Sequence, residues 1–440
     1  MTDVAVADRE LIELPIRQIR PYPANPREHP QRQIEMLAKS ISKYGFNVPV
    51  LVAPDHELIA GHGRLEAAKA LGFDTVPAIV LAHLTAAQRR AYRIADNALS
   101  LKGSWSLELL ATEMQALVEL DVEFDPVDLG FETAEFDGVL SNASGTALSD
   151  QPVPEPDRCR PATSRPGDLW VIGGVHRVLC GDARDPAAYQ QLLGNERAAA
   201  VVSDMPYNVP VEGHVCGLGK VHHREFAMAS GEMTVAQFED FMDVAFGNAV
   251  MFSRPGSVHF QFIDWRSVAR MIMVGERRYE QLLNLCVWVK RNAGMGALWR
   301  SQHELVCAFR APGGKHINNV QLGKHGRNRS NIWSYDGVNS FRAGRLEDLK
   351  AHPTCKPIDL VADAIQDVTN RRDLVLDPFL GSGTTLIAAH ATGRRGAGLE
   401  IDPYFVDTAV TRIAERSGLP VQHEDGRSFE TVRDSREGEA

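Results

Sequence analysis

The sequence predicts an α/β fold with a parallel sheet in its longer part, joined to a smaller α+β unit. Residues 374–400 contain a short apolar strand, a glycine turn, a helix and a second strand, which together form a βαβ unit. Residues 198–203, AAAVVS, are a further apolar run of strand length that ends in polar residues. A proline-rich stretch separates this longer part from the residues before it.

The domain boundaries follow from composition. The chain has 440 residues, 44% of them hydrophobic and 24% charged, which is typical of soluble globular proteins with two to four domains. Residues 141–167 contain five prolines and almost no apolar periodicity, which predicts an extended linker. We therefore expect a first domain over 1–140, a second over 168–424, and a frayed polar tail over 425–440.

The composition also excludes several classes. No apolar run approaches the roughly 18 residues of a membrane span, and the first 20 residues do not resemble a signal peptide. The six cysteines form no Cys-x-x-Cys pair, so a disulfide framework or a cysteine zinc site is not expected. Residues 213–228 hold histidines and a cysteine without fixed ligand spacing, so no metal is predicted there. We expect a cytoplasmic enzyme or regulator.

In the first domain, residues 31–44 carry an apolar stripe with helical spacing, and 48–52 and 57–60 are predicted strands. The next residues, Gly61-His62-Gly63-Arg64, form a glycine turn that leads into a helix ending near Gly72. Free N–H groups at a helix start with an arginine beside them suit an anion. A tight strand–helix turn without a ligand explains the pattern equally well.

The βαβ unit of the second domain places Asp377 at the end of its first strand and Glu400 at the end of its second. The turn between them lacks the third glycine of a dinucleotide fingerprint, because position 386 is Leu, and it lacks the lysine of a phosphate loop. An acid at the end of the second strand, 23 residues after Asp377, is suited to ribose hydroxyls.

Asp204-Met205-Pro206-Tyr207 follow the apolar strand 198–203. A carboxylate, a fixed backbone carbonyl and an aromatic plane can hold a planar amino group with its lone pair directed at an incoming methyl group. The alternative is an aspartate that caps a turn before proline.

The charge is uneven along the chain. The net charge is −10, yet residues 277–356 hold fourteen Lys and Arg against five Asp and Glu. A basic block in an acidic protein is typical of a local nucleic-acid surface, although a solvated face would have the same composition.

Three ordered motifs give a family resemblance over about residues 168–420. DMPY at 204–207, HPTCKP at 352–357 and DPFLGSGTT at 377–385 resemble the beta-type S-adenosylmethionine-dependent DNA amino-methyltransferases. The resemblance implies a Rossmann-like methyltransferase sheet with circularly permuted motif order, double-stranded DNA as the partner, and target recognition by residues 277–350. The family pattern usually has Pro where this chain has Met205. Only the carbonyl of that residue is needed, and Pro206 keeps it extended.

The resemblance also implies roles for individual residues. Asp204 and Tyr207 would hold the flipped base, with Met205 and Pro206 completing the catalytic tetrapeptide. Glu400 would bind the ribose of S-adenosylmethionine, and Asp182 would meet its adenine. Thr354 and Lys356 would lie near its methionine part. The residues expected to line the rest of the cofactor site are Asp377, Pro378, Phe379, Gly381, Gly383 and Thr384.

We therefore expect methylation of the 6-amino group of adenine in DNA, with the 4-amino group of cytosine as the alternative. An acid before Pro-Tyr favours adenine, since the cytosine enzymes usually carry Ser there. Ring-carbon methylation needs a cysteine nucleophile, in that family a Pro-Cys pair, and no cysteine here follows a proline. An alternative from another class is a DNA-binding regulator with an inactive methylase domain.

Residues 10–100 resemble the ParB and sulfiredoxin-like N-terminal domains. The resemblance rests on LPIRQIRPYPANPR, IAGHGRLEAAKALG and VPAIVL. It implies a nucleotide or phosphate site at Gly61, His62, Gly63 and Arg64. Sulfiredoxins need a cysteine in this turn, where this chain has His62, so redox activity is not implied. The oligomeric state is left open, with a homodimer as one option.

Overall fold

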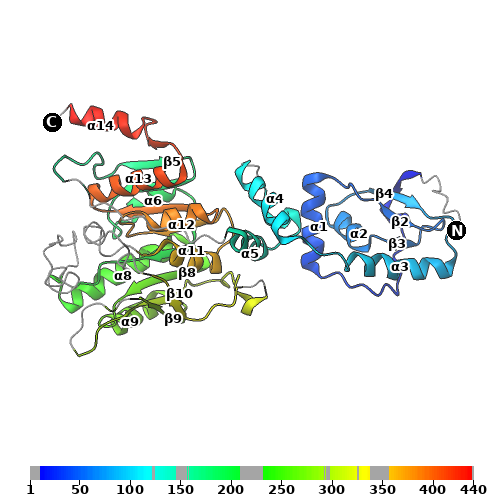
Figure 1. The fold of residues 1–440 in the computed structure, drawn as a ribbon, viewed down its shortest axis with the longest axis horizontal. Helices are drawn as coiled ribbons and strands as arrows, with labels where there is room; N and C mark the ends of the chain where they lie inside the picture. Colours follow the sequence, from blue (N-terminus) through cyan, green and yellow to red (C-terminus); the bar gives the residue numbers. More distant parts are fainter. Residues whose placement is uncertain are drawn as a thin grey trace. The chain divides into compact units, whose positions relative to one another are not determined.

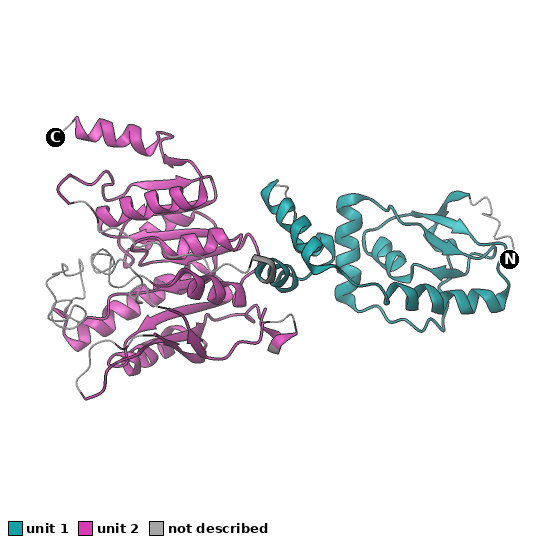
Figure 2. Ribbon diagram, viewed as in Figure 1, with its two compact units in different colours: residues 1–144 teal, residues 145–440 magenta. Residues whose placement is uncertain are grey.

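The computed structural model divides the chain into two compact units, Met1–Ser144 and Gly145–Ala440 (Figure 2). The boundary falls within the stretch for which we predicted a linker. Each unit is described by itself. The residues that the structure describes are 10–120, 124–144, 156, 158–208, 231–291, 293, 298–324, 327–336 and 356–438.

The first unit is built on a four-stranded sheet with the order β1-β4-β2-β3. β1 pairs antiparallel with β4, and β2 pairs parallel with β4 and antiparallel with β3. The apolar stripe predicted for 31–44 is realised as α1, whose Ile41 is buried. The bounds of these elements are β1 Leu11–Pro15, α1 Gln31–Tyr44, β2 Val50–Val52, β3 Leu58–Ala60, α2 His62–Ala70 and β4 Thr75–Val80 (Figure 1).

Three further helices complete the first unit: α3 Ala86–Ser100, α4 Leu107–Glu119 and α5 Thr133–Ser144. Ion pairs tie α1 to the segment before α5, with Lys43 Nζ 2.7 Å from Asp128 Oδ2 and Arg32 Nε 2.9 Å from Glu132 Oε1. α5 continues to Ser144, which is four residues into the range predicted to be extended.

The second unit contains a ten-stranded sheet with the order β11-β9-β10-β8-β7-β12-β13-β6-β5-β14. The central strands β6, β13, β12, β7 and β8 are parallel, whereas β10 is antiparallel to both β8 and β9. The strand bounds are β5 Leu169–Ile172, β6 His176–Cys180, β7 Ala198–Ser203, β8 Ser253–Ile263, β9 Gln281–Val289, β10 His303–Arg310, β11 Ile332–Ser334, β12 Leu374–Asp377, β13 Arg395–Glu400 and β14 Val421–His423 (Figure 1).

Helices pack on both faces of this sheet, which explains why β7 is apolar up to its last residue, Ser203, and buried along its whole length. One core joins strand residues to α11, α12 and α13, and two others join the sheet to α6, α8 and α9. The helix bounds are α6 Pro186–Leu193, α8 Val235–Met251, α9 Val268–Arg278, α11 Ile358–Val368, α12 Thr384–Ala391 and α13 Pro403–Ser417. The α/β class with a smaller α+β unit is therefore confirmed, while the permuted motif order stays a prediction.

The ends of the second unit are more ordered than the sequence indicates. Asp407 accepts hydrogen bonds from the backbone N–H groups of Thr163 and Ser164, at 2.6 and 2.9 Å, so the end of the predicted linker packs on α13. The tail expected to be frayed forms α14, Phe429–Glu437, with Val432 fully buried and Arg436 paired with Asp168. Phe429 at the start of the helix also packs on Trp170, with the ring centres 5.0 Å apart, so a few apolar contacts and one ion pair dock this polar helix. Among the described residues, no helix is long and apolar enough to span a membrane.

Candidate active site

The parallel strands bring the predicted site residues to one edge of the sheet. Because β12 pairs with both β7 and β13 in parallel, the residues that follow β7, β12 and β13 emerge at the same edge. Asp204 follows β7, Asp377 ends β12 and Glu400 ends β13. β6 pairs in parallel with β13, which adds Asp182 to the same edge.

The tetrapeptide after β7 is anchored by its second residue. Met205 is only 1% exposed and packs in the core formed by α8, α9 and β10. Asp204, Pro206 and Tyr207 are half-buried. The buried Met205 side chain therefore fixes the backbone, and the neighbouring side chains of Asp204 and Pro206 stay partly exposed at the edge of the sheet.

The Asp204 carboxylate has a partner on each oxygen. The Tyr207 hydroxyl donates to Asp204 Oδ1 at 2.7 Å, and Lys356 Nζ donates to Oδ2 at 2.7 Å. Lys356 lies just before α11 and is buried, with 8% of its side chain exposed. We predicted Lys356 near the methionine part of a cofactor, and that role stays a prediction; in the structure its ammonium contacts the Asp204 carboxylate.

A second carboxylate, Glu304, completes this cluster. Glu304 Oε2 lies 3.1 Å from Lys356 Nζ and accepts the Tyr207 hydroxyl at 3.3 Å, while Oε1 pairs with Lys290. Sequence reasoning gave no role to Glu304 or Lys290. Local spacing gave no signal for this pair, because Lys290 follows β9 and Glu304 lies near the start of the adjacent β10, and only the pairing of the two strands brings them together.

The four charges of the cluster balance, with two carboxylates and two ammonium groups. Burial raises the pKa of Asp204, and the charge of Lys356 opposes that rise. Burial would raise the pKa of Glu304 too, but Lys356 and Lys290 lower it to about 2. Burial disfavours the charged form of Lys356, yet Asp204 and Glu304 outweigh it and raise its pKa. Lys356 and Glu304 are therefore charged at neutral pH.

Aromatic rings surround the ammonium groups. Lys356 Nζ lies 5.8 Å from the centre of the Tyr207 ring, 5.2 Å from that of Phe262 and 5.9 Å from that of Trp288. Lys290 Nζ lies 4.7 Å from the centre of the Trp288 ring. These distances fall within the range of cation–π attraction, which offsets part of the cost of burying the charges.

Asp377 stabilises the glycine loop after β12 through two hydrogen bonds. Its Oδ2 accepts the Thr385 hydroxyl at 2.5 Å and its Oδ1 accepts the Phe379 N–H at 3.0 Å. Burial raises the pKa of Asp377 to about 7. Gly383 has a φ of +87°, and a Cβ there would lie 3.2 Å from Ala409 Cα, so this position requires glycine.

Glu400 lies beside the same loop. Its Oε2 accepts the Gly381 N–H at 2.8 Å, its Oε1 accepts the Asp402 N–H at 2.9 Å, and burial raises its pKa to about 7. Gly381 has a φ of +53°, and a Cβ there would meet no atom within 4 Å. The loop therefore presents open space next to an acidic acceptor.

The other predicted cofactor residues divide into three groups. Asp182 is paired with Arg184, whose Nη2 lies 2.6 Å from Asp182 Oδ2. Pro378 and Thr384 are buried, and the Thr384 hydroxyl accepts from Arg412 at 3.2 Å, so their side chains support the loop. Thr354 lies outside the described residues, as do 352–355 of the HPTCKP motif and 213–228.

Much of the basic stretch is neutralised by acids from elsewhere in the chain. Arg278 pairs with Asp243, Arg327 with Asp367, and Arg329 with both Asp363 and Asp367. The local charge excess therefore overstates the positive surface of the described part of 277–350. Residues 292, 294–297, 325–326 and 337–350 of that range are outside the described residues.

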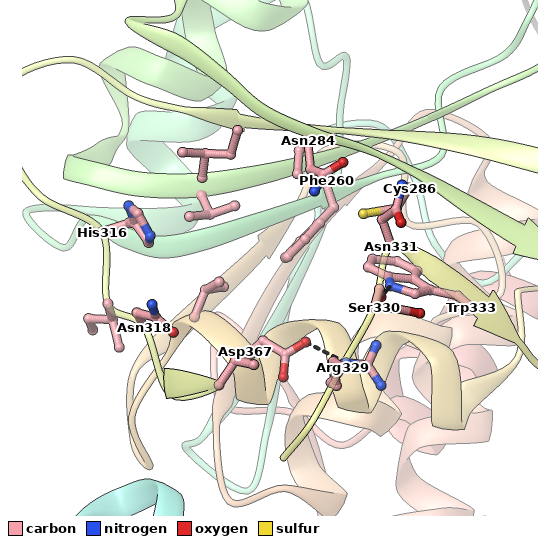
Figure 3. A pocket seen from close by; sticks show the side chains of 16 residues that line it. Phe260, Asn284, Cys286, His316, Asn318, Arg329, Ser330, Asn331, Trp333 and Asp367 are labelled. Atoms are coloured by element: carbon pink, nitrogen blue, oxygen red, sulfur yellow. Dashed lines mark hydrogen bonds and ion pairs between the residues drawn. The ribbon is translucent and has the colours of Figure 1, made fainter. Parts of the chain in front are cut away.

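The Arg329–Asp367 pair lines a hollow of about 220 Å³ between β8, β9 and α11 (Figure 3). Figure 3 shows Phe260 and Trp333 on its sheet side and Asp367 on the helix side. None of the predicted site residues lines it. The ion pairs fix α11 against the basic stretch, and Lys356 is separated from the start of this helix by Pro357 alone.

The glycine turn of the first unit has a left-handed Gly61, with φ +97°, at the start of α2. Burial lowers the pKa of His62 to about 4, so this ring is neutral at pH 7. The buried atoms His62 Nε2 and Arg64 Nε have no hydrogen-bond partner. Buried polar atoms are normally paired, so an acceptor from a ligand would satisfy this turn.

Comparison with known proteins gives two family matches. The DNA methylase family matches residues 198–411, and the ParB N-terminal domain family matches residues 2–98. The ParB-like nuclease domain-containing protein YnaK of Escherichia coli is 41% identical over 81 residues, which cover 18% of this chain and 93% of YnaK.

Relatives of the second unit include the type II methyltransferase M.ScaI of Streptomyces caespitosus. It is 33% identical over 118 residues, which cover 26% of this chain but only 39% of M.ScaI. The solved structure of the M1.HpyAVI–SAM complex aligns with 54% of this chain and 98% of its own, at 19% identity and a TM-score of 0.40. The first unit therefore belongs to the ParB-like N-terminal domains, and residues 198–411 of the second unit match the DNA methylase family.

Proposed function

We propose that the second unit transfers a methyl group from S-adenosylmethionine to the 6-amino group of adenine in double-stranded DNA. The observation that supports this most is the Asp204 carboxylate, which is held at the sheet edge by Lys356 and Tyr207. A carboxylate can accept an N–H of an amino group without bonding covalently to the base. The Met205 carbonyl is the second acceptor, and the Tyr207 ring is the stacking surface for the flipped base.

The residues beside the glycine loop fit the proposed cofactor. Space beside Gly381 and the acceptor oxygens of Glu400 suit a ribose with two hydroxyls. The cofactor supplies an electrophilic methyl group. β12 is the neighbour of β7 in the sheet. An amino group bound at Asp204, after β7, would therefore lie next to the loop after β12 that would bind the methyl donor.

The deprotonation state of Asp204 is central to this mechanism. A protonated carboxyl group would lose acceptor capacity and could not orient the amine. Lys356 stabilises the carboxylate despite its burial, and Glu304 in turn keeps Lys356 charged. After methyl transfer the amine carries an extra proton, which would leave to solvent or to a neighbouring acceptor.

Two alternatives to adenine methylation concern the same site. The 4-amino group of cytosine presents the same pair of N–H donors, and the acid at position 204 favours adenine only by family resemblance. A DNA-binding regulator with an inactive methylase domain would not require the cluster around Asp204. The assembled cluster therefore supports the enzyme.

We also propose that the first unit binds a nucleotide or another phosphate compound at Gly61, His62, Gly63 and Arg64. The unpaired buried atoms His62 Nε2 and Arg64 Nε support this proposal. Arg64→Ala should lower affinity for a nucleoside triphosphate by tenfold or more, because it removes the guanidinium. Calorimetry with ATP, CTP, GTP and UTP tests this, with Arg90→Ala as the control; binding unaffected by Arg64→Ala would contradict the assignment.

Replacing Asp204 tests the catalytic assignment. Asp204→Ala should abolish methylation of DNA but leave the dissociation constant for S-adenosylmethionine nearly unchanged, since the carboxylate meets the base. Tyr207→Ala should lower turnover, and Tyr207→Phe should be milder because it keeps the stacking ring. Single-turnover transfer of labelled methyl groups measures turnover, and calorimetry measures cofactor binding. Near-normal methylation by Asp204→Ala would contradict the proposed mechanism.

Replacing Lys356 tests how Asp204 stays ionised. Without the ammonium the pKa of Asp204 should rise further, so the acid limb of the kcat/KM profile should move to higher pH by about 1–3 pH units. Lys356→Met supplies this change, and Lys356→Arg, which keeps the charge, should shift the limb less. If both variants lose cofactor affinity while the acid limb stays in place, Lys356 serves the methionine part of the cofactor instead.

Glu400 gives a prediction for cofactor binding. Glu400→Ala should weaken S-adenosylmethionine binding by about 1–3 kcal/mol, the cost of unmet buried polar partners. Because the pKa of Glu400 is raised to about 7, its acceptor form is present above that pH and lost below it. Wild-type affinity should therefore fall from pH 8 to pH 6, and affinity of Glu400→Gln should depend less on pH. Unchanged affinity in a folded Glu400→Ala protein would refute the role.

A further inference from the structure

Two large apolar side chains are unusually exposed next to the candidate active site. Leu298 is 79% exposed and Trp299 is 82% exposed, more than any other large hydrophobic residue that the structure describes. Both lie in the connection between β9 and β10. Exposed apolar groups of this size indicate a surface that another molecule covers.

The sheet topology places this connection at the catalytic edge. β8 is parallel to β7, β10 is antiparallel to β8, and β9 is antiparallel to β10. β9 therefore ends, and β10 begins, at the edge where Asp204 follows β7. The base of the connection is closed by the Lys290 N–H, which donates to the Gln302 carbonyl at 2.9 Å.

The same strand ends contribute to the cluster around Asp204. Lys290 pairs with Glu304, and Glu304 contacts Tyr207 and Lys356. The chain that presents Leu298 and Trp299 is thus anchored, at both of its ends, to residues that surround the proposed base site. A molecule that delivers a base to Tyr207 must pass close to this connection.

The chemistry of the connection suits nucleic acid. Arg291 and Arg300 flank the apolar pair, and the side chain of Arg291 is 70% exposed although it also pairs with Asp336 at 3.3 Å. The Arg300 guanidinium also donates to the Ala293 carbonyl. Exposed apolar side chains with arginines near them in the chain fit a partner with anionic edges and stacked apolar planes. Duplex DNA has both features, and removal of one base from its stack opens a planar gap.

We propose that Trp299, backed by Leu298, inserts into the DNA stack at the place vacated by the flipped base. This inference rests on the proposed methyltransferase activity. Inserted apolar side chains partly replace the stacking that is lost when a base leaves the duplex, and an aromatic ring can stack on any base because every base has a π-face. The role is one of positioning, because Trp299 would hold the duplex open while Asp204 and Tyr207 hold the base.

The test compares two DNA substrates. The recognition sequence is first mapped by sequencing DNA methylated by the wild-type protein. Trp299→Ala should then lower kcat/KM at least tenfold on a fully paired duplex. On a duplex with an abasic site opposite the target, where the base leaves its stack more easily, the loss should be threefold or less. Trp299→Phe, which keeps a ring, should be intermediate on the paired duplex.

The controls separate this role from folding and from the proposed function. Met251→Ala removes another exposed apolar side chain, 62% exposed, just before β8 and so at the opposite edge of the sheet; it should stay within twofold of wild type on both substrates. Cofactor affinity of Trp299→Ala should equal that of wild type. Equal losses on both duplexes, or no loss on either, would overturn the wedge. If the wild-type protein itself methylates no DNA, it is the proposed function that fails.

Discussion

The contact between Lys356 and Asp204 is the constraint on which the site depends. It joins the residue that precedes α11 to the residue that follows β7, two points 152 residues apart in the chain. A buried ammonium between carboxylates is costly unless its charge is fully balanced. Glu304 and Lys290 supply that balance, so four elements must be correctly placed before Asp204 can remain ionised. The site is therefore a product of the whole sheet and not of one loop.

The architecture explains how these elements meet. Asp182, Asp204, Asp377 and Glu400 lie at one edge of the sheet because the strands before them are parallel. Lys290 and Glu304 lie at the same edge because the antiparallel strands β9 and β10 respectively end and begin there. The Asp377 carboxylate accepts hydrogen bonds from the Thr385 hydroxyl and the Phe379 N–H, and so stabilises its own loop. The Glu400 carboxylate accepts the Gly381 N–H and lies beside the open space at that glycine. Asp377 is buried within the loop, whereas the half-buried Glu400 lies beside the space proposed for the ligand.

How much the sequence could predict depends on the range of each interaction. Strand-terminal residues such as Asp204 and Glu400 were found because short apolar runs mark the strands and local motifs mark their ends. Glu304 and Lys290 were missed because pairing across β9 and β10 is not visible in local spacing. The tail was expected to fray because α14 is polar, yet Val432 and the Arg436–Asp168 pair dock it. Charge counting overstated the basic surface, because partners such as Asp363 and Asp367 lie outside the counted stretch.

The central claim is that Asp204 directs an exocyclic amine, and not a ring carbon, toward a methyl donor bound at the glycine loop. The most direct measurement is to incubate the full chain with duplex DNA and S-adenosylmethionine labelled in its methyl group, digest the DNA to nucleosides, and separate the products. We predict label in N6-methyl-2′-deoxyadenosine, with none in the products of Asp204→Ala. Label found only in 5-methyl-2′-deoxycytidine, or no label above a protein-free control, would contradict this prediction.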